Sequence, residues 1–190
     1  MPNLNFATRE ITYKIVYYGT GLGGKTTNIK HVYRTLAPDS RGELVSVATE
    51  TERTLFFDFL PIDLGTVHEF RTRIALYTVP GQLEYNQCRK MILKAVDGII
   101  FVADSSEIRS IENSESIQNM LDNLKENQLE LDNIPWILQY NKRDLADAMP
   151  IERMQKELNF ANVPHFASVA SEGKEVMSTL EEITRLVMAK

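Results

Sequence analysis

The sequence has little of what marks secreted, membrane-spanning or disulfide-stabilised proteins. Its 190 residues include one cysteine, Cys88, which excludes an internal disulfide and a cysteine-based zinc site and favours a reducing compartment. No apolar run approaches the ~20 residues that a membrane helix needs. The chain starts without a basic-then-apolar leader, and residue 2 is proline rather than the glycine of a myristoylation signal. We therefore expect a cytoplasmic protein with no direct membrane anchor.

Basic residues are also scarce, with 21 Lys and Arg against 26 Asp and Glu and a net charge of −5. This balance gives no electrostatic reason to expect binding to nucleic acid. The charge is unevenly spread: residues 1–95 carry 12 basic and 9 acidic residues, whereas residues 107–133 carry seven acids and two bases. The positive half suits a polyanionic ligand. The acidic segment is either a solvated face or a docking site for a basic partner, and the sequence leaves both open.

No repeat, low-complexity tract or linker divides the chain, so we predict one domain over residues 1–190. Short apolar runs, continuous enough for strands buried on both faces, occur at Ile15–Tyr18, Ile74–Val79, Ile99–Ala103, Trp136–Tyr140 and Phe166–Ala170. Residues 55–62 form another β-rich run, and Asp63-Leu64-Gly65 suggests a turn into a strand over 71–79. Helical patterns cover residues 25–36, 83–95, 112–126, 151–158 and 173–189.

This alternation predicts an α/β fold with a mostly parallel six-stranded sheet, one antiparallel edge strand and helices on both faces. In such sheets ligands bind at the carboxyl ends of the strands. The run Gly19-Thr20-Gly21-Leu22-Gly23-Gly24-Lys25-Thr26 lies between a predicted strand and a predicted helix, and it matches the phosphate-loop pattern G-x-x-x-x-G-K-[S/T]. Glycines let backbone N–H groups face phosphate oxygens. We predict that Lys25 neutralises the β- and γ-phosphates, that Thr26 binds Mg²⁺ and that Thr27 joins the nucleotide site.

A second motif, Asn141-Lys142-Arg143-Asp144, follows the predicted strand over residues 136–140. The Asp144 carboxylate can accept hydrogen bonds from N1–H and the 2-amino group of guanine, whereas adenine offers neither donor. We therefore predict a guanine nucleotide, with Asn141, Lys142 and Asp144 in the base site. The Ala170 N–H and Ser171, after the next strand, are further candidates for the guanine oxygen.

Together these residues resemble the small Ras-like GTPases over essentially the whole chain. The closer resemblance is to the MglA-type bacterial polarity GTPases, on the run Ala48-Thr49-Glu50-Thr51-Glu52-Arg53-Thr54-Leu55-Phe56-Phe57-Asp58 and on Tyr77-Thr78-Val79-Pro80-Gly81-Gln82. The resemblance implies the P-loop NTPase fold of small G proteins, with GTP as substrate, GDP as product and Mg²⁺ as cofactor. It also implies a switch in bacterial cell polarity and motility.

Thr78 stands where most small GTPases have an aspartate, and the MglA-type proteins characteristically have threonine there. The missing carboxylate would hold Mg²⁺ through water, so we expect looser Mg²⁺ retention or a substitute acid, with Asp58 a candidate. Gly81 and Thr78 join the predicted nucleotide site. The resemblance implies that Thr54 is the switch threonine, which binds Mg²⁺ and the γ-phosphate. From the residues alone, Thr49 and Thr51 are equally candidates for this role.

Gln82 follows Gly81 and is predicted to orient the attacking water. Arg53, beside Thr54, is predicted to act as an arginine finger in cis, which the resemblance implies moves into place when a partner shifts the neighbouring strand. The resemblance further implies a roadblock-fold MglB-like activator, an exchange factor, polarity or motility effectors, and recruitment to a cell pole. A GTP-dependent binding module with negligible hydrolysis is the alternative. A nucleotide kinase fits less well, because no lid for a second substrate is apparent.

Overall fold

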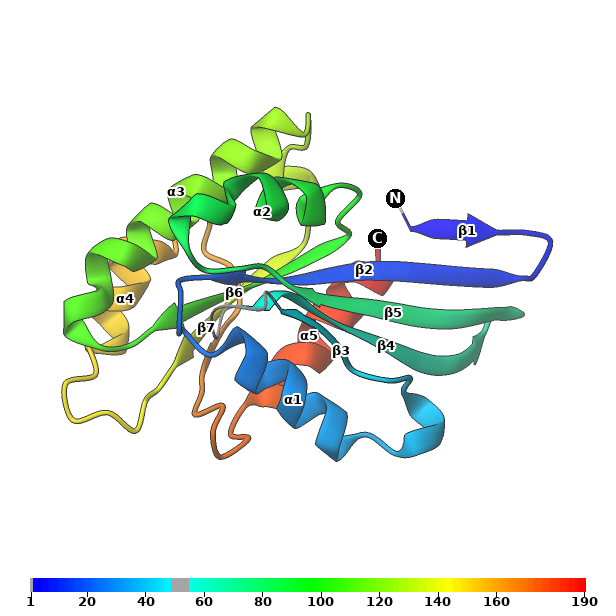
Figure 1. The fold of residues 1–190 in the computed structure, drawn as a ribbon, viewed down its shortest axis with the longest axis horizontal. Coiled ribbons are helices and arrows are strands. Elements are labelled where there is room, and N and C mark those ends of the chain that lie inside the picture. The colour runs from blue at the N-terminus through cyan, green and yellow to red at the C-terminus, as the bar shows by residue number, and fades with distance from the viewer. Residues whose placement is uncertain (1, 49–54) are drawn as a thin grey trace.

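The computed structural model describes residues 2–48 and 55–190. Its described residues form one sheet in the order β3-β4-β5-β2-β6-β7-β8, with β1 beside β2 (Figure 1). The strands are β1 (Asn3–Asn5), β2 (Glu10–Gly19), β3 (Val45–Ala48), β4 (Leu55–Val67), β5 (Phe70–Thr78), β6 (Gly98–Asp104), β7 (Trp136–Asn141) and β8 (His165–Ala167). The helices are α1 (Lys25–Thr35), α2 (Asn86–Leu93), α3 (Ser110–Glu126), α4 (Ile151–Leu158) and α5 (Val176–Met188).

The predicted fold class is confirmed, but the sheet has eight strands where six were expected. The two additions are the short strands β1 and β3, whose three or four residues give too little alternation to be recognised. Strand β4 runs antiparallel to β5, as expected. It is not the edge of the sheet, however, because β3 pairs with its outer side.

The turn expected at Asp63-Leu64-Gly65 is wrong. Strand β4 continues through these residues to Val67, and the chain reverses at His68 and Glu69, which both have left-handed backbones with φ of 48° and 70°. The Asp-x-Gly sequence instead makes a bulge, where the pairing with β5 shifts between Asp63 and Thr66. Polar residues with glycine mark either feature, which explains the error.

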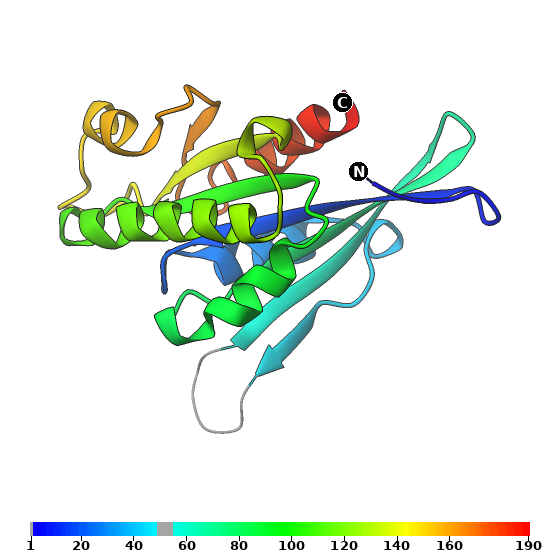
Figure 2. The same cartoon turned by 90° about the horizontal axis from the view of Figure 1, so that it is seen from above.

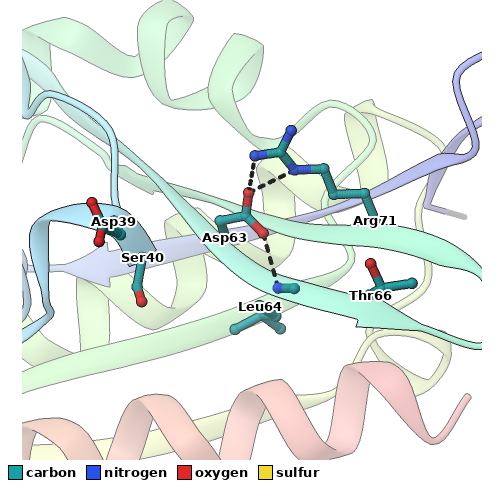
Figure 3. A pocket seen from close by; sticks show the side chains of 7 residues that line it. Asp39, Ser40, Asp63, Leu64, Thr66 and Arg71 are labelled. Carbon is teal, nitrogen blue, oxygen red and sulfur yellow. Dashed lines mark hydrogen bonds and ion pairs between the residues drawn. The ribbon is translucent and has the colours of Figure 1, made fainter.

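Figure 3 shows the shallow hollow beside this bulge, which Asp39 and Ser40 also line. The Asp63 carboxylate turns to Arg71, whose Nε lies 2.7 Å away, and it also accepts the Gly65 N–H at 2.9 Å. These bonds hold the pKa of Asp63 below its usual value, the backbone N–H contributing most. The carboxylate is thus already paired within the hairpin, and we assign the hollow no function.

Two apolar layers sandwich the sheet, with α1 and α5 on one face and α2, α3 and α4 on the other (Figure 1). Strand β2 divides its side chains between them: Ile15 and Tyr17 face α1 and α5, whereas Val16 and Tyr18 face α2 and α3. All four are fully buried, as predicted for a strand covered on both faces. The last helix turns one apolar face to the sheet, with Val176, Leu180, Ile183 and Val187 in the core.

The sheet extends well beyond its helices at one end. The β1–β2 and β4–β5 hairpins project together on this side (Figure 2). The loop between β2 and α1 lies at the opposite end, where the parallel strands have their carboxyl ends (Figure 1). Among the described residues, no helix is long and apolar enough to cross a membrane.

The acidic segment over residues 107–133 spans α3 and its flanking turns. Several of its acids are paired within the chain: Glu107 with Arg153, Glu112 with Arg109, and Glu126 with Lys90. The segment therefore holds neighbouring basic side chains in place, and its acids are not all available to a partner.

Candidate nucleotide-binding site

A cavity of about 1000 Å³ opens at the carboxyl edge of the sheet. Ten of the predicted site residues line it: Gly19, Gly21, Leu22, Gly24, Lys25, Thr26, Thr27, Thr78, Gly81 and Gln82. They come from the loop between β2 and α1 and from the end of β5, which β2 and β5 bring side by side as parallel neighbours. The structure thus unites two motifs that lie more than 50 residues apart in the sequence.

Two glycines fix the course of the phosphate loop. Gly19 has φ of 137°, and a Cβ added there would lie 2.1 Å from the backbone oxygen of Val102 in β6. Gly24 has φ of 107°, and its added Cβ would lie 2.1 Å from Nδ2 of Asn141. L-residues with a side chain disfavour such backbones, and neither place has room for a methyl group. Glycine at both positions therefore lets the loop pack closely on β6 and on the predicted base loop.

Lys25 is buried beneath the loop, and its ammonium donates to the carbonyl oxygens of Gly19 at 2.9 Å and Thr20 at 2.6 Å. Burial, together with the positive charge of Arg89, lowers the pKa of Lys25 to about 7. Negative charge nearby raises the pKa of a lysine. A polyphosphate in this cavity would therefore stabilise the charged form of Lys25.

Asp58 of β4 is fully buried and accepts hydrogen bonds from Thr26 and Thr78, two of the threonines predicted near Mg²⁺. Its Oδ2 lies 2.7 Å from Oγ1 of Thr26 and 2.9 Å from Oγ1 of Thr78. Its Oδ1 accepts from the Ser46 hydroxyl at 2.7 Å. The sheet register explains the arrangement, because Phe59 pairs with Tyr77 and so places Asp58 opposite Thr78. A carboxylate thus lies beside Thr78, although Thr78 itself carries none.

These oxygens suit a metal that is shared with a nucleotide. The described residues contain no group of three or more His, Cys, Asp or Glu side chains that could enclose a metal ion. Mg²⁺, however, is usually held by one or two carboxylates together with phosphates and waters. The Thr26 hydroxyl lines the cavity, and the buried Asp58 carboxylate lies 2.7 Å behind it, so the two groups fit such a site.

The base loop is joined to the phosphate loop through Asn141. Its Nδ2 donates to the Gly23 carbonyl at 2.8 Å, and its Oδ1 accepts from the Ala170 N–H at 2.9 Å and the Ser168 hydroxyl at 3.1 Å. One buried side chain therefore holds three loops together. The Ala170 N–H, a predicted guanine contact, is the same group that donates to Asn141.

None of the predicted base-site residues is among the described residues that line the cavity. Asp144 and Ser171 are exposed at the surface. Lys142 has a left-handed backbone with φ of 67°, and its ammonium donates to Oδ2 of the buried Asp104 at 2.7 Å. The carboxylate of Asp144 is thus accessible to a ligand, while Lys142 is fixed against β6.

Arg89 of α2 is a component of the site that the sequence analysis missed. It is buried and lines the cavity, and its guanidinium donates to the carbonyl oxygens of Pro80 and Gln82. Its Nε donates to Oδ1 of Asn119 in α3 at 2.8 Å. Arg89 thereby fixes the backbone beside Gln82. Its spacing of four residues from the buried Leu93, one helical turn, was a signal that it faces inward.

Four predicted switch residues lie outside the described residues: Thr49, Thr51, Arg53 and Thr54. Their assignments remain predictions. The chain on either side is described, and β4 begins at Leu55, three residues before Asp58.

Comparison with known proteins identifies the family. The model of the ADP-ribosylation factor family matches residues 3–184. The mutual gliding-motility protein MglA of Myxococcus xanthus is 50% identical over 190 residues, covering 100% of this chain and 97% of that protein. An ADP-ribosylation factor-like protein of Dictyostelium discoideum is 26% identical over 133 residues, covering 70% of this chain and 67% of that protein. Human ADP-ribosylation factor-like protein 4A is 24% identical over 147 residues, covering 77% of this chain and 66% of that protein. The chain belongs to the ADP-ribosylation factor family and is an MglA-like small GTPase.

Proposed function

We propose that this protein binds GTP with Mg²⁺, hydrolyses it to GDP and phosphate, and controls cell polarity and motility through partners that recognise its nucleotide state. The main support is that Lys25, Thr26 and Gln82 line one cavity, that the Asp58 carboxylate accepts the Thr26 hydroxyl beside it, and that Asn141 joins the phosphate loop to the base loop. These groups supply charge neutralisation, oxygen ligands and a water-orienting amide in one place.

In this proposal the phosphate loop binds the anion before any chemistry occurs. The first N–H groups of α1 have no partner within their helix, and together with the loop N–H groups they can donate to phosphate oxygens. Lys25 places its ammonium against the phosphates, and Thr26 offers its hydroxyl to the metal. Mg²⁺, when bound, neutralises charge on the β- and γ-phosphates. Asp58 takes the place of the carboxylate absent at residue 78, and its negative charge retains the metal.

Hydrolysis is assigned to Gln82 and Arg53. The amide of Gln82 orients the attacking water, and the guanidinium of Arg53 stabilises charge that develops on the transferred phosphate. Arg89 supports this step by holding the Gln82 carbonyl, so the glutamine backbone is fixed before an activator binds. We infer slow hydrolysis by the protein alone and faster hydrolysis with a roadblock-fold MglB-like activator.

Gln82→Ala and Arg53→Ala are each expected to lower activator-stimulated hydrolysis by about 10³-fold. GTP affinity should stay within about threefold of the unchanged protein, because neither side chain is assigned to ground-state binding. Phosphate release with and without an MglB-like activator measures the first quantity, and titration with fluorescent GTP measures the second. Normal turnover by either variant would remove that residue from the mechanism.

Gly81→Ala is expected to lower hydrolysis by about 10²-fold, the usual penalty for a small misplacement of a catalytic group. A Cβ at Gly81 would lie 2.3 Å from Cα of Gly21 and 2.4 Å from its nitrogen, so the loop that carries Gln82 must move away from the phosphate loop. Single-turnover phosphate release measures the effect, and the melting temperature checks the fold. Unchanged hydrolysis would show that the contact between the two loops is not needed for catalysis.

The assignment to motility is drawn from the relative in Myxococcus xanthus, which is named as a gliding-motility protein. Deletion of the gene, with tracking of single cells and of pole-localised proteins, tests it; normal movement and normal polar localisation would refute it. An exchange factor and polarity or motility effectors are the further partners in this proposal, with recruitment to a pole by one of them.

Strand β4, which follows the predicted switch residues 49–54, has partly exposed aromatic side chains that suit partner binding. On β4, Leu60 lies in the core with α1, whereas Phe57 and Phe59 lie half-buried and pack on the Tyr77 ring, with centroids 6.2 Å and 4.8 Å away. Leu60 thus belongs to the half of the strand that faces the core. The partly exposed aromatic half is a candidate surface for the activator.

A GTP-dependent binding module with negligible hydrolysis is the second candidate, favoured by threonine in place of aspartate at residue 78. The two functions differ in one measurement. Phosphate release that an MglB-like partner accelerates supports the enzyme, whereas nucleotide-dependent partner binding without release supports the binding module.

A further inference from the structure

Arg109 lies at the start of α3, after the carboxyl end of β6, and its guanidinium reaches across to the phosphate loop. Nη2 donates to the carbonyl oxygen of Gly21 at 2.8 Å. Nη1 donates to Oε1 of Glu112 at 3.0 Å, and Nε lies 3.9 Å from Oδ2 of Asp104. Asp104 is only 2% exposed, so its negative charge acts on Arg109 with little screening by solvent. Arg109 is therefore held on three sides, one of which is the phosphate loop.

The bond to Gly21 fixes the orientation of one peptide group in the loop. In a planar trans peptide, the carbonyl oxygen of one residue and the N–H of the next point in opposite directions. Because Arg109 holds the Gly21 oxygen, the Leu22 N–H must point away from Arg109. No group in the described part of the chain accepts a hydrogen bond from this N–H. It is therefore available to a ligand of the loop, with its direction set by Arg109.

The hydrogen bond from Arg109 to Gly21 helps to explain the left-handed backbone of Leu22. Its φ is 60°, in the left-handed region that is sterically costly for a residue with a side chain. Its side chain is 90% exposed, so burial of the side chain does not offset that cost. Backbone contacts must hold the conformation, and the charged hydrogen bond from Arg109 to the preceding carbonyl is one of suitable strength. A left-handed residue in such a loop directs successive N–H groups into an anion-binding concavity.

We propose that Arg109 is a positioning residue for the nucleotide phosphates, acting through the Gly21–Leu22 peptide and not by reading the base. This proposal rests on the proposed function, since it presumes that the loop binds a guanine nucleotide. Arg109 also links the phosphate loop to the base loop, because Asp104, its neighbour, accepts the Lys142 ammonium. We expect the contribution of Arg109 to nucleotide affinity to depend on the number of phosphates that the ligand presents to the loop.

The test compares the affinities of GMP, GDP and GTP for Arg109→Ala and for the unchanged protein, by competition with fluorescent GDP. Loss of a charged hydrogen bond that orients one donor is expected to weaken GDP and GTP by about tenfold, with GMP unchanged within about twofold. Arg153→Ala is the matched control: this exposed arginine of α4 pairs with Glu107 and Glu157 outside the cavity. It should leave all three affinities unchanged.

Arg109→Lys separates geometry from charge. A single ammonium cannot reproduce the guanidinium fork that joins Gly21 to Glu112, so we expect most of the loss to persist. Full recovery with lysine, an equal loss for GMP and GDP, or no loss with alanine would each overturn the proposal. If the unchanged protein does not prefer GDP over GMP, the proposed function itself fails, which keeps the two failures distinct.

Discussion

Asp144→Asn is expected to change the preferred base from guanine to xanthine. Guanine presents two donors, N1–H and the 2-amino group, and the carboxylate of Asp144 can accept both. An amide offers one acceptor and one donor, which matches xanthine, where an oxygen replaces the 2-amino group. Sites built to satisfy such groups reject the wrong partner strongly, so GDP affinity should fall by about 10³-fold or more. Affinity for xanthosine diphosphate should rise in the variant.

Competition between fluorescent GDP and unlabelled xanthosine or guanosine diphosphate measures this change. Asp147→Asn is the matched control, because Asp147 is a nearby exposed carboxylate that accepts the Ser106 hydroxyl at 2.6 Å. It should leave the base preference unchanged. If Asp144→Asn kept its preference for GDP, Asp144 would not be the residue that recognises the base, and the guanine prediction would depend on Ala170 and Ser171.

The phosphate loop and the base loop could be predicted because each is contiguous in the sequence. A motif of eight residues, from the end of a buried strand to the start of a helix, identifies its chemistry locally, and most of its residues line the cavity. Asn141 was predicted as a base-site residue, whereas its bonds to Gly23, Ser168 and Ala170 depend on how three strands end together. Residue type and spacing indicated the site, but not the contacts that hold it.

Arg89 and Arg109 escaped prediction because the groups that they bind in the loops of the site are backbone carbonyls. A carbonyl group has no residue type, so the bond from Arg109 to Gly21, 88 residues away, leaves no mark in the sequence. The same reason applies to the fold. Short continuous apolar runs predicted the buried parts of β2, β6 and β7. Strand β1, however, depends on pairing with the outer end of β2, which begins at Glu10, five residues before the predicted start.

The sequence indicated Asp58 but not its contacts. Its replacement is the second change for which we expect a large effect. The sequence suggested Asp58 as a substitute for the acid missing at Thr78, and the structure places its carboxylate 2.9 Å from the Thr78 hydroxyl. Asp58→Asn keeps the shape but removes the charge that attracts Mg²⁺. The Mg²⁺ concentration needed to slow release of fluorescent GDP should rise by about tenfold to 100-fold, as found when metal-orienting groups are lost. A chelator should then accelerate release much less than in the unchanged protein.

Moving the carboxylate provides the decisive control. In the double variant Asp58→Asn with Thr78→Asp, a carboxylate returns on the neighbouring strand, directly across the β4–β5 pairing. If Asp58 serves through its charge beside the metal, this variant should recover most of the Mg²⁺ dependence. If Asp58 serves only to hold Thr26, Ser46 and Thr78 by hydrogen bonds, the displaced charge cannot restore it. Asp63→Asn, farther along the same strand, should leave the Mg²⁺ dependence unchanged. If the rate of GDP release from the unchanged protein did not depend on Mg²⁺, Asp58 would have no role in holding the metal.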